Sequence, residues 1–96
     1  MPAAYVISEV EIRDESLADD YRRLAADSIA RYGGRYLVRG GKRELIEGGP
    51  PPQAIIVVEF PSMEIAKEWY ASSAYAEALK VRASALERRL VFVEGV

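Results

Sequence analysis

The 96-residue chain contains no cysteine, histidine, threonine or asparagine, and the first two absences exclude the most chemistry. Without cysteine there is no disulfide and no thiol nucleophile. Without histidine the chain lacks the side chain best suited to proton transfer near neutral pH, and a zinc site would need carboxylates alone. Acid-base catalysis would therefore fall to Glu, Asp, Tyr or Lys, and we expect no metal ion and no other cofactor.

Long apolar runs and an excess of positive charge are also missing. No apolar run approaches the roughly 20 residues that a membrane-spanning helix needs, and the N-terminus lacks the pattern of a signal peptide. The formal net charge is −2 and the sequence pI is about 5.2, whereas a nucleic-acid partner requires a basic face. We therefore expect a cytoplasmic protein that binds neither a membrane nor nucleic acid.

Apolar residues make up half of the chain. In a chain of this length they suffice for one two-layer core and not for two, so residues 1–96 are expected to form a single domain. Surface that so short a chain cannot cover by itself is often covered by a second copy, and a homo-oligomer is therefore expected.

The hydrophobic pattern predicts a strand, a helix, two strands, a pair of helices and a last strand. Asp14 is a plausible N-cap for the first helix, which ends at Gly33-Gly34, where glycine allows the chain to reverse. A proline-rich connection separates the second and third strands. The predicted strands are residues 4–12, 35–39, 54–60 and 90–96, and the helices begin after Asp14, Ser62 and Ser73.

Both helical segments of such a chain pack on the same side of an antiparallel sheet, because the crossovers are right-handed. We therefore predict an α+β fold, a ferredoxin-like βαββαβ layer with a four-stranded antiparallel sheet. The other side of the sheet is left open, although Ile7, Leu37 and the apolar strand 54–60 place apolar side chains there. A second subunit packed sheet to sheet would cover this open face, so we expect a homodimer.

The stretch RYGGRYLVRGG, residues 31–41, contains four glycines and three arginines. It is not a phosphate-binding P-loop, because Tyr36 stands where the first glycine is needed and arginine follows the Gly-Lys pair instead of Ser or Thr. One glycine pair ends a helix and the other ends a strand. A period of two places Arg35, Leu37 and Arg39 on one face of this strand, which makes that face basic.

Glu59 interrupts the apolar strand AIIVVEF at residues 54–60. A buried carboxylate must be paired, or its pKa rises. Arg39 or Arg35 is expected across from it, as a carboxylate–guanidinium pair. Two interpretations stay open: the pair fixes the strand register, or Glu59 is a general base beside an arginine that holds an anionic substrate.

Aromatic and basic residues gather near the break between the last two helices. Arg82 lies on the stripe of its helix that is expected to face the sheet, where it either reaches the rim with its stem on Trp69 or binds a ligand. Trp69, Tyr70 and Tyr75 either line a pocket or belong to the core. The run Glu87–Arg89 is interpreted as solvated surface.

Several motifs together resemble a bacterial family, the domain of unknown function thirteen-thirty, over nearly the whole chain. They are a Gly-Gly-Arg strand that ends in Arg-Gly-Gly, a Glu-Phe-Pro-Ser step into a helix, a Trp-Tyr pair, and a Ser then a Tyr before an arginine-bearing helix. The matching residues are Gly33, Gly34, Arg35, Arg39, Gly40, Gly41, Glu59, Phe60, Pro61, Ser62, Trp69, Tyr70, Ser72, Tyr75 and Arg82.

The resemblance implies a dimeric α/β barrel, in a superfamily with cofactor-independent monooxygenases, haem-degrading enzymes, lactone isomerases and members of no known reaction. The chain departs from the family at Ala71–Ala74, ASSA, where the family commonly has Asp-Ser-Pro-Glu. The loss of two acids there argues against catalysis at that corner. Haem degradation is further disfavoured because no histidine is available to ligate iron.

Three functions are compatible with these residues. An isomerase or monooxygenase acting on a small anion without a metal would use Glu59 as base and Tyr70 or Tyr75 as donors, in a pocket between sheet and helices. A binding protein would keep the pocket without the chemistry. A structural dimer would have the pocket filled by Trp69 and its neighbours. The residues expected to bind the ligand are Arg39, Arg82, Arg35, Trp69 and Ser72.

Overall fold

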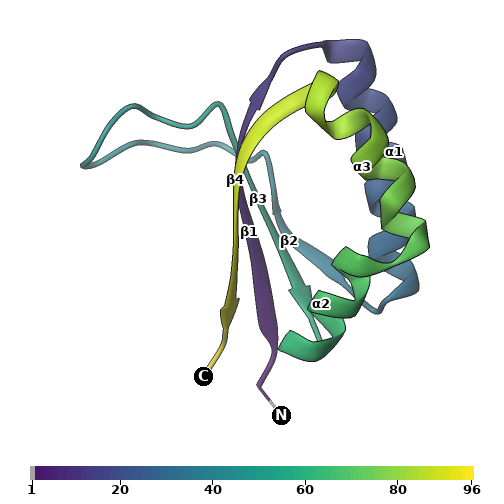
Figure 1. The fold of residues 1–96 in the computed structure, drawn as a ribbon. Helices are drawn as coiled ribbons and strands as arrows, with labels where there is room; N and C mark the ends of the chain where they lie inside the picture. Colours follow the sequence, from purple (N-terminus) through teal and green to yellow (C-terminus); the bar gives the residue numbers. More distant parts are fainter. Residues whose placement is uncertain (1) are drawn as a thin grey trace.

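The computed structural model describes residues 2–96, which form one antiparallel sheet and three helices (Figure 1). Along the chain the elements are β1 (Ala4–Ile12), α1 (Glu15–Arg31), β2 (Arg35–Arg39), β3 (Ala54–Phe60), α2 (Met63–Ala71), α3 (Ser73–Ala85) and β4 (Leu86–Glu94). The strand order is β2-β3-β1-β4. This order and the antiparallel pairing of every neighbouring strand confirm the predicted ferredoxin-like layer.

All three helices lie on one side of the sheet, called the helix face below, and the other side is the open face (Figure 1). Even-numbered residues of β1 and β3, such as Val6, Val58 and Phe60, are buried on the helix face. Odd-numbered residues point to the open face because side chains alternate along a strand. The termini lie near each other at one end of the sheet (Figure 1).

The helices do not cover the sheet evenly. α1 packs mainly on α3, and α2 is the element that packs against the three strands β1, β3 and β4. The aromatic core lies under α2, where Trp69 packs on Phe60 and Tyr75 with ring centroids 5.1 and 4.2 Å apart. Because α1 rests on α3 more than on the sheet, space is left between α1 and the strands.

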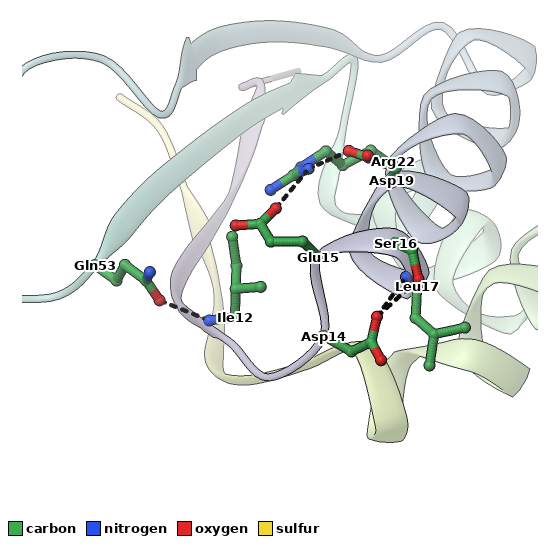
Figure 2. A network of polar contacts seen from close by, with 8 residues as sticks. All are labelled: Ile12, Asp14, Glu15, Ser16, Leu17, Asp19, Arg22 and Gln53. Carbon is green, nitrogen blue, oxygen red and sulfur yellow. Dashed lines mark hydrogen bonds and ion pairs between the residues drawn. The ribbon is translucent and has the colours of Figure 1, made fainter.

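Caps and one tight turn explain where the helices begin and end. Asp14 accepts a hydrogen bond from the Leu17 N–H at 3.0 Å and so begins α1, as predicted (Figure 2). Ser62 and Ser72 cap α2 and α3 in the same way. After α1, Gly33 adopts a φ of 73°, which favours glycine.

Two features of the strands differ from the prediction. β4 covers Leu86–Glu94 rather than residues 90–96. It begins earlier because Leu86, Arg88, Leu90 and Phe92 alternate towards the helix face. β2 contains a bulge between Tyr36 and Val38, so that Leu37 has no partner on β3. Because of the bulge, the residues of β2 after Leu37 point to the face of the sheet opposite to the one that regular alternation predicts.

The connection between β2 and β3 extends beyond the sheet on the side away from the helices (Figure 1). Its base is braced by Arg43, whose guanidinium donates to the carbonyls of Gly41, Pro52 and Gln53. Gln53 in turn accepts a hydrogen bond from the Ile12 N–H at 2.7 Å (Figure 2). The loop is therefore attached to β1 as well as to its own strands.

Candidate functional site

A cavity of about 450 Å³ lies between α1 and the helix face of the sheet. Its lining is mostly apolar and includes the buried Trp69. The exposed members of its lining, Arg22, Arg39 and Gly40, mark the mouth. The apolar lining includes Val6, Val10, Ala54, Ile56, Val58 and Leu86.

The charged side chains of this lining are all arginines: Arg22, Arg39 and Arg88, with no aspartate or glutamate among them. Arg22 forms an ion pair with Asp19 (Figure 2), and the distance between Nη1 and Oδ1 is 2.6 Å. Arg39 and Arg88 form no ion pair with a carboxylate in residues 2–96. The positive charges of these two guanidinium groups are therefore not compensated by a carboxylate within the described residues, which favours an anion nearby.

Arg39 reaches the cavity because of the bulge in β2. After the bulge Val38 pairs with Val57 on the open face, and Arg39 pairs with Ile56 on the helix face. Its guanidinium carbon lies 4.2 Å from the centroid of the Tyr36 ring, a cation–π contact that holds the side chain beside the cavity. Burial is the main cause that raises the pKa of Tyr36, so this phenol is neutral.

Arg88 comes from β4 at the opposite edge of the sheet and is held by two tyrosines. Its Nη2 donates to the Tyr75 hydroxyl at 2.7 Å, its Nη1 donates to the Tyr21 hydroxyl, and the two hydroxyls are 2.6 Å apart. Burial by itself lowers the pKa of Arg88, but the two tyrosines raise it by more, so the guanidinium stays charged. Burial is likewise the main cause that raises the pKa of Tyr75 far above its usual range.

Polar groups also lie deeper in the site. Ser8 is buried in the floor, in one register row with Arg39, Ile56 and Leu90. The Trp69 indole N–H donates to the Ser28 hydroxyl on α1 at 3.0 Å, which fixes the wall of the cavity. Ser28 itself donates to the Ala25 carbonyl.

Of the residues that the sequence suggested, the cavity brings together only Arg39 and Trp69. Tyr75 is fully buried behind the cavity, in contact with Arg88 and Tyr21. Arg82 is half-buried on α3 and does not line the cavity.

Glu59 lies on the open face, because its neighbours Val58 and Phe60 point into the core. Its carboxylate pairs with Arg35, with 2.7 Å between Oε1 and Nε, and accepts a bond from the Tyr5 hydroxyl at 3.3 Å. The expected pair therefore exists with Arg35, and the expectation that Arg39 shares its face was wrong. A ligand inside the cavity cannot contact Glu59.

Tyr70 and Ser72 lie at the junction of α2 and α3, outside the cavity lining. The Ser72 hydroxyl donates to the Trp69 carbonyl at 2.7 Å and accepts from the Tyr75 N–H. It therefore caps both the end of α2 and the beginning of α3. Tyr70 is 40% exposed and its ring meets Phe92 edge-on.

The sequence interpretation missed Arg88, Tyr21 and Tyr36. Arg88 was assigned to solvated surface with its charged neighbours, which was wrong. The signal that would have found it is the alternation of Leu86, Arg88 and Leu90, which extends the last strand and puts Arg88 on the buried face. Tyr21 gave no such signal, because a tyrosine on an apolar helix stripe usually belongs to the core.

Residues 2–96 offer neither a metal site nor a membrane-spanning helix. No group of three or more Asp, Glu, His or Cys is placed to hold a metal ion. In the same part of the chain no helix combines the length and apolar character needed to cross a membrane.

Solved structures similar to this chain include three of interest for the fold. The RPA0582 protein of unknown function from Rhodopseudomonas palustris is 23% identical, with a TM-score of 0.81 over 99% of this chain and 83% of that one. A dimeric protein of unknown function and ferredoxin-like fold from Bacteroides fragilis is 16% identical, with a TM-score of 0.66 over 97% and 96%. SnoaB, a cofactor-independent oxygenase from Streptomyces nogalater, is 7% identical, with a TM-score of 0.65 over 100% and 95%.

At these identities the three likenesses establish the fold alone. No protein of curated function matches the sequence. A family model, in contrast, matches residues 3–96, which is almost the whole chain. The chain therefore belongs to the family described as domain of unknown function (DUF1330).

Proposed function

We propose that this protein binds a small anionic organic molecule in the cavity between α1 and the sheet. The observation that carries the proposal is the charge of the lining, which has three arginines and no carboxylate, with two of the arginines free of any carboxylate partner in the described residues. A guanidinium beside an apolar cavity gains most from an anionic ligand, because charge-assisted hydrogen bonds are about twice as strong as neutral ones.

The cavity suits a ligand with an apolar body. Its volume of about 450 Å³ lies within the ~300–1,000 Å³ that small-molecule sites usually have. The apolar floor would cover rings or short aliphatic chains, and Arg39 at the mouth would hold the anionic group. Trp69, which lines the cavity, would pack against the ligand body.

The test is a thermal-shift titration with 2-naphthoate, with the uncharged 2-naphthamide as the matched ligand. At ~100 times its Kd the carboxylate is expected to add roughly 2.7 kcal/mol to the stability of the fold, a rise in Tm of about 10 °C or more. The amide is expected to give a much smaller rise. Equal stabilisation by both compounds would contradict the anion site. No stabilisation by either compound would favour the third function, a structural dimer without a ligand.

A second candidate is an enzyme of isomerase or monooxygenase type that converts the bound anion without a metal. The charged Arg88 and its two tyrosines support it, because such donors stabilise negative charge that develops on a substrate oxygen. Simple binding comes first because the cavity lining holds no carboxylate base. Glu59 and Tyr70 would act in catalysis only through a site other than this cavity, whereas Tyr75 would act here only through its hydrogen bonds to Tyr21 and Arg88.

The same proposal includes a homodimer through the open face. Val38, Val57, Ile7 and Val91 form one register row across all four strands, and Val38 and Val91 are exposed in the single chain. Leu45 and Ile46 add exposed apolar side chains on the loop that extends to this side (Figure 1). A second copy packed sheet to sheet would bury this row and complete a dimeric α/β barrel.

A further inference from the structure

Tyr21 and Arg88 line the cavity and form a hydrogen-bonded cluster with Tyr75; Arg88 comes from β4, at the opposite edge of the sheet from Arg39 on β2. Arg88 donates to both hydroxyls, and the hydroxyls bond to each other at 2.6 Å. A guanidinium has donors only, so each tyrosine oxygen accepts a bond from Arg88. Each tyrosine hydroxyl also has one proton of its own to donate. Only one of these two protons can lie in the hydrogen bond between the tyrosines, so the other must be donated elsewhere.

Burial decides which tyrosine is the donor in that bond. Tyr75 is 0% exposed and does not line the cavity, whereas Tyr21 is 9% exposed and does. Within residues 2–96 the Tyr75 hydroxyl has Tyr21 as its only hydrogen-bond acceptor. If Tyr21 were the donor, the Tyr75 proton would be buried without an acceptor, which is costly. Tyr75 therefore donates to Tyr21, and the proton of Tyr21 is left for the cavity.

We infer that Tyr21 donates a hydrogen bond to a negatively charged oxygen of the ligand, a phenolate or an enolate, with Arg88 and Tyr75 polarising its hydroxyl. This assignment rests on the proposed anion-binding function, and it adds the chemical class of the ligand oxygen. An oxygen that accepts two donated bonds, as Tyr21 does, becomes a stronger donor itself. The ligand oxygen at this end would therefore be a phenolate or an enolate.

The position of Arg39 and Arg88 on opposite edge strands suits a ligand with two oxygen functions. Arg39, Ile56, Ser8 and Leu90 form one register row from the first to the last strand of the sheet. Three strand spacings separate the backbones of Arg39 and Leu90 by ~14 Å, and Arg88 lies two residues from Leu90 on the same face, so the two arginines reach the cavity from opposite edges of the sheet. A carboxylate at Arg39 and a phenolate or enolate oxygen at Tyr21, joined by a flat apolar body, would span the site.

The experiment compares 6-hydroxy-2-naphthoate with 2-naphthoate by isothermal titration. In the unaltered protein the hydroxy compound is expected to bind at least tenfold more tightly, and its phenol, followed by fluorescence against pH, is expected to ionise at least one pH unit lower than in solution. Tyr21→Phe is expected to remove this preference. Tyr32→Phe, at the end of the same helix and outside the cavity lining, is the matched control.

Each outcome has a separate meaning. If neither naphthoate binds, the proposed function fails, and this inference fails with it. If both bind equally well, or the bound phenol ionises at its solution pH or higher, the proposed function stands and the role of Tyr21 is overturned. The fluorescence titration uses the unaltered protein, so the result does not depend on whether Tyr21→Phe folds.

Discussion

Arg35 and Arg39 are four residues apart on β2, yet their side chains lie on opposite faces of the sheet. Arg35 pairs across the strands with Glu59 on the open face, and Arg39 pairs with Ile56, which lines the cavity. The cause is the bulge between Tyr36 and Val38, since one unpaired residue reverses the alternation for the rest of the strand. One arginine is thereby neutralised and the other is left available to a ligand.

Replacing these two arginines in turn is expected to separate their roles. Arg39→Leu is expected to weaken 2-naphthoate binding at least tenfold, because hydrogen bonds to charged groups contribute roughly 1.5–3 kcal/mol. Arg35→Leu, made on the same strand, is expected to change the Kd by less than twofold. Isothermal titration of both variants measures the difference, and an equal loss in the two would show that the anion is not held at the cavity.

The homodimer is tested by a charge placed in the middle of the apolar row. Val57→Asp is expected to give a monomer, because the carboxylate would be desolvated at the interface without a partner. Ala76→Asp, which adds the same charge on the exposed side of α3, is expected to leave the dimer intact. Sedimentation velocity at micromolar concentration gives both masses, and a monomeric unaltered protein would contradict the dimer directly.

The turn after α1 is expected to reject any side chain at Gly34. A Cβ there would lie 2.7 Å from Ile29 Cγ2 and 2.7 Å from Phe60 Cε1, both in the core. Gly34→Ala is expected to lower the free energy of unfolding by ~1–3 kcal/mol in urea titrations, the usual cost of overpacking. Gly41→Ala is the control, since nothing lies within 4 Å of its Cβ. Equal stability of the two variants would mean that the turn shifts to accommodate a Cβ at Gly34 without a loss of stability.

The stabilisation of α1 by its N-cap residue Asp14 is expected to depend on pH. The Leu17 N–H, and after it the Ser16 side chain, lower the pKa of Asp14 below its ordinary value of 3.8. Because the folded pKa is the lower one, the stabilisation is complete above about pH 3.8 and is lost as the pH falls through the folded value. Thermal melts of the unaltered protein and Asp14→Ala are therefore expected to differ most near neutral pH and to converge in acid.

A second variant separates the charge of Asp14 from its capping role. Asp14→Ser keeps a capping oxygen without a titrating group. Its advantage over Asp14→Ala is expected to stay constant from neutral pH to acid. If the unaltered protein also kept a constant advantage, the hydrogen bond to Leu17 would not depend on the ionised carboxylate.

Much of the fold could be predicted because its signals are local. The strands 4–12, 35–39 and 54–60 and the caps at Asp14 and Ser62 depend on alternation and on the hydrogen bonds of nearby residues, which the order of amino acids contains. The last strand was predicted too short, because the charged residues Glu87 to Arg89 hid an alternation that continues to Leu86.

The candidate site was less accessible to prediction, because its residues meet only through pairing and packing. Whether Arg39 faces the helices depends on a bulge, which forms when β2 pairs with β3. Tyr21 and Arg88, 67 residues apart, become neighbours only when α1 and β4 enclose the same space.

By itself the sequence determined which chemistry is absent, where most strands and helices begin and end, and that the sheet has one open face, since composition and periodicity suffice for these. Only the tertiary structure decided that α1 packs on α3 and leaves a cavity, that Arg39 and Arg88 line it, and that Glu59 does not. The physical reason is that the face of a strand residue and the neighbours of a buried side chain depend on contacts between distant segments of the chain.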